Sequence, residues 1–342
     1  MTGPGPYTAE RSLYSVDEVT AMLAAGDVLI LAGEERLLAD LPKGEWLGGT
    51  SPYFMTNELG GTCDRDRLFV QKLPAGASVA WLGLLDRAAM PDMAALGADN
   101  GYTIVLMPGH SDVHSDFALH GLDWPGLFKR PVVGWVTGVA GERAGVDEPK
   151  VFDGRTGIAS SEQAAILHVA LPDTDFARVD IVNLFEPDMD GPVLTFGEDS
   201  GAAGFTVEWA LVDGVRTRLA DYITENDIDT RLPLVADYNG AIINVATAAV
   251  DAEAGRITFF APVHPGIGYR FARPIGDYEQ EFANRIGTPR GEVAFSCNCI
   301  LNYNYAGLEG RHTPGIAGPV SFGEIAYMLL NQTMVYLMID RD

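Results

Sequence analysis

The pattern of apolar and polar positions predicts short strands and a few helices in the first part of the chain. Ser15 and Glu18 match a capping box, and Val16, Val19 and Met22 follow at helical spacing. Ser111 precedes a second helical pattern that ends near residue 119. Apolar runs of strand length lie at 28–31, 68–73, 79–85, 102–107 and 132–139. Strands mixed with helices in this way predict a layered α/β or α+β domain.

The remainder of the chain is richer in strand patterns. Residues 141–155 carry Gly, Glu, Asp, Arg and Pro, which predicts a loop or connection between a region at 1–140 and a region at 156–342. Asp213-Gly214 separates two apolar runs and predicts a hairpin, and a second hairpin is expected around residues 251–255. Further runs predict strands at 165–171, 179–184, 192–196 and 293–297, a helix at 278–286, a helix after residue 322 and a strand at 334–339.

Gly, Pro and aromatic residues occur together in two places, at 48–54 and at 315–323. Duplication of one half of the chain is one explanation of this weak likeness, and chance is the other. The fold class we predict is mixed α/β, with two related layered halves of mixed sheets flanked by helices. A pocket is expected between or within these halves.

Composition and charge exclude several classes of partner. The chain has 342 residues, of which 47% are hydrophobic, so it is long enough to bury a sizeable core. Its net charge of -24 repels phosphate backbones and anionic lipid, which argues against nucleic acid and membrane surfaces. The three cysteines are too few for a disulfide framework, and neither a secretory signal nor a run of about 20 apolar residues occurs. We therefore expect a cytoplasmic protein.

Short motifs in a particular order carry a family resemblance. Near the C-terminal end they are Phe259-Phe260-Ala261, Phe295-Ser296-Cys297, the Gly- and Pro-rich run before Glu324, and Asn331-Gln332-Thr333. Nearer the start they are Gly48-Gly49-Thr50-Ser51 and Pro131 to Trp135. Together these segments resemble the FIST family, whose members resemble intracellular signal-transduction sensors in bacteria. Trp135 stands where the family has a second Gly, and Arg311 lies well downstream of Cys297-Asn298-Cys299.

The resemblance implies a small-molecule ligand and a separate signalling protein as partner. Glycine turns at Gly48-Gly49 and Gly315-Gly318 are expected to bring backbone N–H groups to a small polar ligand. Glu324 is expected to bind an amine or hydroxyl, and Arg270 or Arg311 a carboxylate, so an amino-acid-like ligand fits. The remaining expected ligand-binding residues are Thr50, Ser51, Tyr53, Cys297, Phe322 and Asn331.

Histidines and cysteines support an alternative function. His110 and His114 are four residues apart with Asp112 between them, a spacing that can place metal ligands on one face of a helix. The same residues also suit an ordinary helix start, because Ser and Asp cap helices. Cys297 and Cys299 lie on one face of a predicted strand and suit a metal, a redox pair, a nucleophile or plain core packing. The alternative is thus a haem- or transition-metal-dependent sensor or enzyme.

Motifs of several enzyme classes are missing from the sequence. The chain has no GxxxxGK[ST] phosphate loop, no GxSxG elbow, no paired CxxC and no complete GxGxxG after a strand. The sequence therefore gives no support to a nucleotide-dependent enzyme or a serine hydrolase. We predict a ligand-binding sensor or carrier rather than an enzyme, with no required cofactor.

Overall fold

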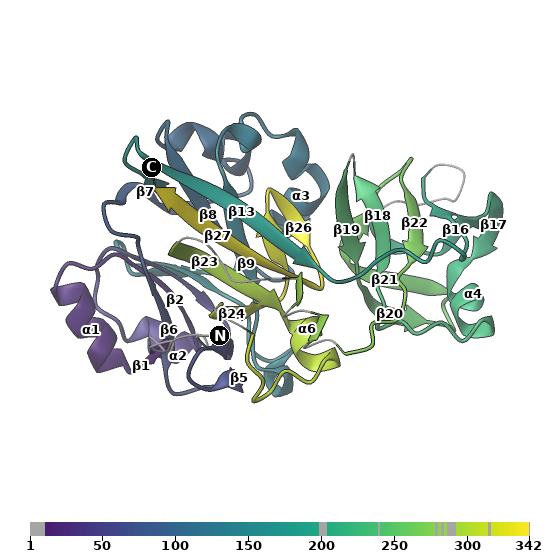
Figure 1. Cartoon of the computed structure of the whole chain (residues 1–342), viewed down its shortest axis with the longest axis horizontal. Helices are drawn as coiled ribbons and strands as arrows, with labels where there is room; N and C mark the ends of the chain where they lie inside the picture. The colour runs from purple at the N-terminus through teal and green to yellow at the C-terminus, as the bar shows by residue number, and fades with distance from the viewer. Residues whose placement is uncertain are drawn as a thin grey trace, which may run out of the picture.

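Strands dominate the chain and assemble into five sheets in two lobes (Figure 1). The computed structural model describes residues 11–197, 204–238, 240–277, 280–281, 284–285, 292–313 and 316–341. Three sheets form a large lobe from both ends of the chain, and residues 184–272 form a small lobe that is inserted between them. Among the described helices, none is long and apolar enough to cross a lipid bilayer.

Sheet one lies at the N-terminal side of the large lobe, and α1 (Val16–Ala24) and α2 (Glu35–Ala39) flank it. Ser15 Oγ accepts the backbone N–H of Glu18, and the Glu18 side chain accepts that of Ser15, so the predicted capping box is confirmed. The strands, in spatial order, are β1 (Leu13–Tyr14), β6 (Leu68–Lys72), β2 (Leu29–Gly33), β3 (Trp46–Thr50), β10 (Val151–Asp153) and β11 (Ile158–Ser160).

Sheet two joins strands from distant parts of the sequence. In spatial order it contains β26 (Met328–Leu330), β25 (Glu324–Ala326), β9 (Val132–Thr137), β8 (Gly101–Pro108), β12 (Ala164–Ala170) and β7 (Ser78–Leu85). The helix α3 (Asp112–His120) follows β8, and short 3-10 helices lie at Met90–Leu96, Gly121–Asp123, Leu127–Lys129 and Gly141–Arg143. Ser111 Oγ caps α3 by accepting the N–H of His114 at 3.2 Å, as the sequence predicts.

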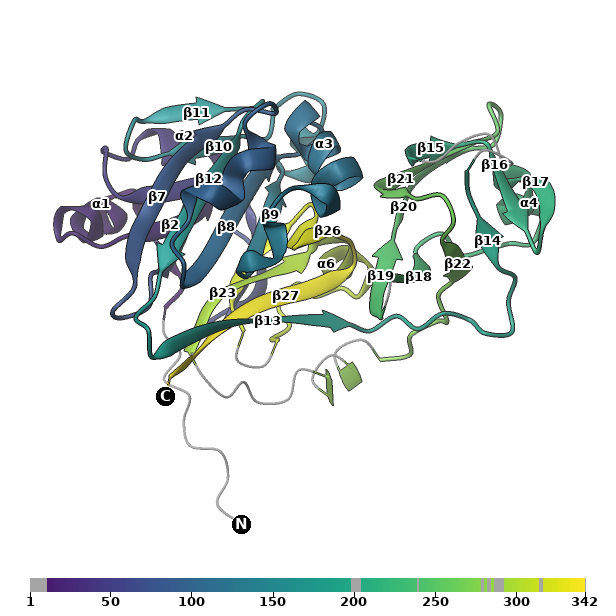
Figure 2. The same ribbon diagram turned by 90° about the horizontal axis from the view of Figure 1, so that it is seen from above.

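Sheet three completes the large lobe. Its order is β13 (Asp175–Asn183), β27 (Thr333–Arg341), β23 (Glu292–Cys299), β24 (Gly318–Ser321), β4 (Tyr53–Thr56) and β5 (Gly60–Cys63), with α6 (Ile300–Tyr305) after β23. Seen from above, β13 runs along the outside of the large lobe (Figure 2). Strands from both sides of residues 141–155 share sheets two and three, so the predicted division into two halves does not follow the sheets.

The small lobe has a sheet of six strands and a sheet of three. The first contains β17 (Val215–Arg218), β16 (Trp209–Val212), β14 (Leu194–Thr195), β22 (Gly268–Phe271), β18 (Leu234–Tyr238) and β19 (Ala241–Val245). The second contains β15 (Gly204–Val207), β21 (Arg256–Val263) and β20 (Thr247–Asp251), and α4 (Leu219–Glu225) packs beside them. The hairpin predicted at Asp213-Gly214 joins β16 to β17, and both turn residues have positive φ.

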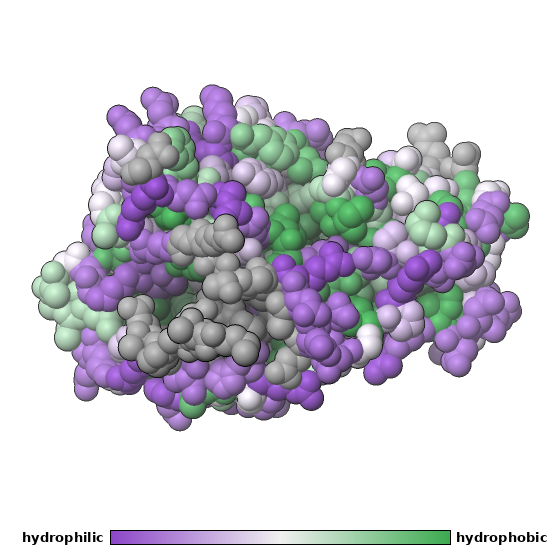
Figure 3. Space-filling view, viewed as in Figure 1, coloured by the Kyte–Doolittle hydropathy of each residue, from purple (hydrophilic) through white to green (hydrophobic). Residues whose placement is uncertain are grey.

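One core holds the large lobe together. Its cluster of buried apolar residues takes Leu47 from sheet one, Leu106 and Trp135 from sheet two, and Phe295 and Leu337 from sheet three. Full burial of such side chains contributes about 1.5–3 kcal/mol each. The small lobe has a core of its own, and apolar surface gathers where the two lobes meet (Figure 3).

The prediction of a helix after residue 322 is wrong. Residues 324–330 form the hairpin of β25 and β26, with Tyr327 at φ 62° in its turn. A residue with positive φ interrupts an α-helix, and β25 instead pairs with β9 in the middle of sheet two. The helix expected at 278–286 lies largely outside the described residues.

Candidate functional site

Glu324 lies in the middle of the large lobe and has no exposed surface. It begins β25, opposite Trp135 of β9. Among the described residues, no Lys or Arg forms an ion pair with it. A carboxyl group in such a place must be satisfied by hydrogen bonds or be neutral.

The hydrogen bonds around Glu324 suit a protonated carboxyl group. Thr333 donates its N–H (3.1 Å) and its hydroxyl (2.9 Å) to Oε2. Ser321 Oγ contacts Oε1 and also lies 3.2 Å from the carbonyl oxygen of Asn298. The Ser321 hydroxyl has one proton, so both of its contacts are satisfied when Glu324 donates to Ser321 and Ser321 donates to Asn298. Burial raises the pKa of Glu324 to about 7, although the hydrogen bonds that Ser321 and Thr333 can offer to the ionised carboxylate lower it.

The two cysteines near Glu324 are core residues. Cys297 and Cys299 are both buried, and burial raises the pKa of each thiol well above its usual value. Cys297 packs in the large-lobe core, where its Sγ lies 3.4 Å from the carbonyl oxygen of Gly134. Cys299 packs instead beside Ala246 of the small lobe. A buried, protonated thiol is a poor nucleophile and a poor metal ligand, so the geometry favours core packing.

The two histidines at α3 have different surroundings. His110 precedes the helix with φ 65° and is exposed, whereas His114 is buried and packs edge-to-face with the ring of Phe205 in the small lobe. Burial lowers the pKa of His114 to about 4, so its ring is neutral at pH 7. Within the described ranges, no group of three or more His, Cys, Asp or Glu residues is arranged to hold a metal ion.

Gly48 and Gly49 lie inside strand β3 rather than in a turn, which corrects the predicted glycine turn. A Cβ on Gly49 would lie 2.7 Å from Thr137 Cγ2 of sheet two, and a Cβ on Gly48 would lie 3.0 Å from the Trp46 ring, so close packing on the two faces of β3 favours glycine at both positions. Gly318 begins strand β24, and Gly315 lies outside the described residues. The backbone around Gly48 and Gly49 therefore pairs with β2 and β10 within sheet one.

The hydroxyl groups of Thr50, the last residue of β3, and of Ser51 form hydrogen bonds inside the protein. Thr50 Oγ1 accepts the backbone N–H of Lys150 at 3.0 Å. Ser51 has no exposed surface and donates to the carbonyl oxygen of Val320 at 2.7 Å. Both side chains thus connect neighbouring segments, and neither is open to a ligand.

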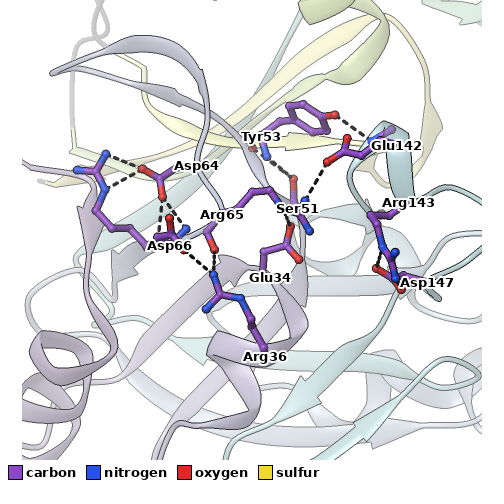
Figure 4. Close-up of polar contacts among 12 residues, drawn as sticks. Glu34, Arg36, Ser51, Tyr53, Asp64, Arg65, Asp66, Glu142, Arg143 and Asp147 are labelled. Carbon is purple, nitrogen blue, oxygen red and sulfur yellow. Dashed lines mark hydrogen bonds and ion pairs between the residues drawn. The ribbon is translucent and has the colours of Figure 1, made fainter.

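Ion pairs surround Ser51 and Tyr53 (Figure 4). Arg65 lies between Glu34 at 2.6 Å and Glu142 at 2.9 Å, and the hydroxyl of Tyr53 accepts the N–H of Gly141 at 3.0 Å. The hollow beside them has a volume of about 20 Å³. Such a space holds about one water molecule, so this region is too small for an organic ligand.

A much larger cavity, of about 610 Å³, lies where the lobes meet. The small lobe contributes Phe185 and the segment between α4 and β18, whereas the large lobe contributes α6 and the turn between β26 and β27. Residues 274–277, in the connection that follows the small lobe, and Arg311 complete the wall. The polar residues on its wall are Asp229, Arg231, Asp277, Asn302, Tyr305, Arg311 and Gln332, and the apolar ones include Phe185, Leu232 and Ile275. We call this cavity the junction pocket.

Two amide side chains on the wall of the junction pocket have fixed orientations. Asn302 donates its Nδ2 hydrogens to Asn298 Oδ1 (3.0 Å) and to the carbonyl oxygen of Thr333 (3.3 Å). Gln332 donates from Nε2 to the carbonyl oxygen of Arg231 at 2.9 Å. A carbonyl oxygen only accepts, so neither amide can flip without losing a bond. The oxygens Asn302 Oδ1 and Gln332 Oε1 are buried and have no hydrogen-bond partner among the residues that the structure describes.

Of the residues predicted from the sequence, Arg311 lines the junction pocket, and Asn331 directly precedes Gln332, which also lines it. Asn331 connects the lobes, since its backbone oxygen accepts from Asn244 at 3.1 Å. Arg270 lies in the small lobe and donates to the carbonyl oxygen of Gly191, away from Glu324. Phe322 packs against Tyr53 at 6.5 Å between ring centroids. The predicted residues therefore do not form one site.

Sequence reasoning missed Arg231, Asn302 and Gln332 as pocket residues. Asn302 lies between Leu301 and Tyr303 in the sequence, and such apolar surroundings are a usable signal for a buried polar role. Gln332 and Arg231 carry no such signal, because each directly follows a polar residue in the sequence.

Comparison with protein families matches residues 14–340 to the model described as Family of unknown function (DUF6976). The chain belongs to this family. No curated protein matches it. The DUF6976 match spans both lobes and therefore includes every wall residue of the junction pocket. The resemblance to the FIST family stays a prediction.

Proposed function

We propose that this DUF6976 chain is a cytoplasmic small-ligand-binding protein of the sensor type. Its ligand lies in the junction pocket and is small, polar and amino-acid-like. The observation that carries the proposal is a cavity of about 610 Å³ between two lobes, with charged groups of both signs on its wall. Ligand pockets commonly have volumes of about 300–1,000 Å³ and lie at domain interfaces.

The wall of the junction pocket complements a ligand with an ammonium group and a carboxylate. Asp229 and Asp277 attract a cationic group, and Arg231 and Arg311 attract an anionic one. Arg231 also pairs with Asp229 at 2.7 Å and holds the pKa of that carboxyl below its usual range, so this acid is ionised at pH 7. The oxygens of Asn302 and Gln332, which have no partner among the described residues, are acceptors for a ligand N–H group once a small side-chain shift uncovers them.

The contribution of both lobes suits a sensor. Arg231 comes from the small lobe, whereas Asn302 and Gln332 come from the large lobe. A ligand that contacts both sides favours one relative placement of the lobes over others, which is how binding shifts a conformational equilibrium. A separate signalling protein, as the FIST resemblance implies, would respond to that placement.

The test is calorimetric titration of the full chain with each of the twenty amino acids, together with a variant that fills the pocket. Ala306 lines the pocket at the C-cap of α6, so Ala306→Trp places a large ring inside it. The matched control is Ala25→Trp, because Ala25 is also a C-cap alanine in the αR conformation but is exposed at the end of α1. We expect binding to the unchanged chain and to the control, and none to Ala306→Trp. Equal binding by all three proteins, or no heat from any amino acid, contradicts the proposal.

A further inference from the structure

Strand β13 ends sheet three with a long and regular edge. Its nine residues pair with β27 over the whole length, without a bulge. Its other side forms no backbone hydrogen bond with any described residue between Phe176 and Val182. A nine-residue edge presents a row of unpaired N–H and C=O groups about 30 Å long, and such an edge favours pairing with another strand.

The side chains of β13 are only half covered because the sheet stops there. Ala177 and Val179 pack against the large-lobe core yet remain partly exposed, and Ile181 is 42% exposed. Phe176, on the opposite face, is 52% exposed. Neither Pro nor Lys occurs in the strand, so two common devices that block edge pairing are missing.

The charges of β13 are complementary to themselves. Arg178 and Asp180 lie on the outer face, on either side of Val179, and Arg178 pairs with Asp180 and with Asp340 in its own chain. When two copies of the strand run antiparallel about a two-fold axis through Val179, Arg178 of each lies opposite Asp180 of the other. The same register places Ala177 opposite Ile181, so the half-exposed apolar residues of the inner face cover one another.

We propose that β13 pairs antiparallel with β13 of a second copy of this chain, centred on Val179. The pairing makes one continuous sheet of twelve strands from two six-stranded sheets. It leaves the junction pocket unchanged, since none of the residues on the pocket wall comes from β13. The dimer therefore does not depend on the proposed ligand.

A charge-swap series with light scattering tests the pairing. The unchanged chain is expected to approach twice its mass of 36.7 kDa as its concentration rises. Arg178→Asp and Asp180→Arg each place like charges opposite one another at two positions, so each weakens the dimer by about tenfold. The double variant restores opposite charges and the dimer. Arg36→Asp breaks an exposed ion pair with Asp66 outside β13 and leaves the mass unchanged.

A cysteine variant tests the register. Val179→Cys, in a chain that also carries Cys63→Ser, places each new thiol opposite its own copy, at a spacing that suits a disulfide. Mild oxidation is expected to link two chains, whereas Val215→Cys, at a residue that is 66% exposed on β17, stays unlinked. A mass of 36.7 kDa at every concentration overturns the proposal. A dimer that is insensitive to both charge swaps, or no disulfide at Val179→Cys, overturns it equally.

Discussion

Replacing Glu324 by Gln is expected to change how stability depends on pH. Burial raises the pKa of this carboxyl from 4.5 to about 7 in the folded chain, whereas the unfolded chain keeps the ordinary value. Between these values the folded state binds a proton that the unfolded state releases. Stability from this group is therefore complete below pH 4.5 and is lost as the pH rises through 7. The difference between these two pKa values corresponds to a loss of about 3 kcal/mol of folding stability by pH 8.

Gln at this position keeps the hydrogen bonds of the neutral acid. Its oxygen accepts from Thr333, and its Nε2 donates to Ser321 Oγ, the atom that Glu324 contacts in the folded chain. The variant has no proton to lose. We therefore expect similar stability for both proteins near pH 5 and a variant that is more stable by up to about 3 kcal/mol near pH 8.

Urea denaturation, followed by tryptophan fluorescence at several pH values between 5 and 8, measures the difference directly. The control is Glu253→Gln, a change of the same chemistry at an exposed turn residue between β20 and β21, for which the difference should not vary with pH. A flat difference for Glu324→Gln, or one that favours the unchanged chain as pH rises, would refute the neutral, buried carboxyl.

Three further outcomes follow from the buried groups. His114→Phe should make the stability of the folded chain less sensitive to acid. Burial lowers the pKa of His114 from 6.5 to about 4, so its stabilising contribution is complete above pH 6.5 and is lost as the pH falls through 4. Urea denaturation of both proteins across this pH range measures the difference. Iodoacetamide at pH 8 should modify only Cys63 in the folded chain and all three cysteines in urea, and mass spectrometry counts the modified residues. Rapid modification of Cys297 or Cys299 in the folded chain would contradict their assignment to the core. Gly49→Ala should lower the free energy of unfolding by about 1–3 kcal/mol because its Cβ meets Thr137 Cγ2 at 2.7 Å. Gly141→Ala should lower it less, because the nearest atom to its Cβ is Tyr53 Oη at 3.6 Å. Equal losses in urea denaturation would contradict the packing argument.

Local signals in the sequence predicted local structure well. Ser15 and Ser111 cap helices, and Asp213-Gly214 turns a hairpin, because each of these features depends on a few neighbouring residues. The mixed α/β class is also as predicted, although strands form most of it. The helix expected after residue 322 failed because long-range pairing of β25 with β9 decides that segment.

The site could be predicted only in part. Glu324 stands out as a lone carboxylate among apolar residues, and the structure buries it, but the sequence could not show that Ser321 and Thr333 satisfy it. The junction pocket needs Arg231, Asn302 and Gln332 together, from three segments far apart in the chain. Their meeting depends on how the inserted lobe docks on α6, and no spacing rule contains that information.

Native mass spectrometry of the chain as purified, beside Ala306→Trp and Ala25→Trp, tests the central claim most directly. We predict a small added mass on the unchanged chain and on Ala25→Trp, and its loss from Ala306→Trp, because only that ring fills the junction pocket. An added mass that Ala306→Trp retains would contradict the account, since the ligand would then bind elsewhere.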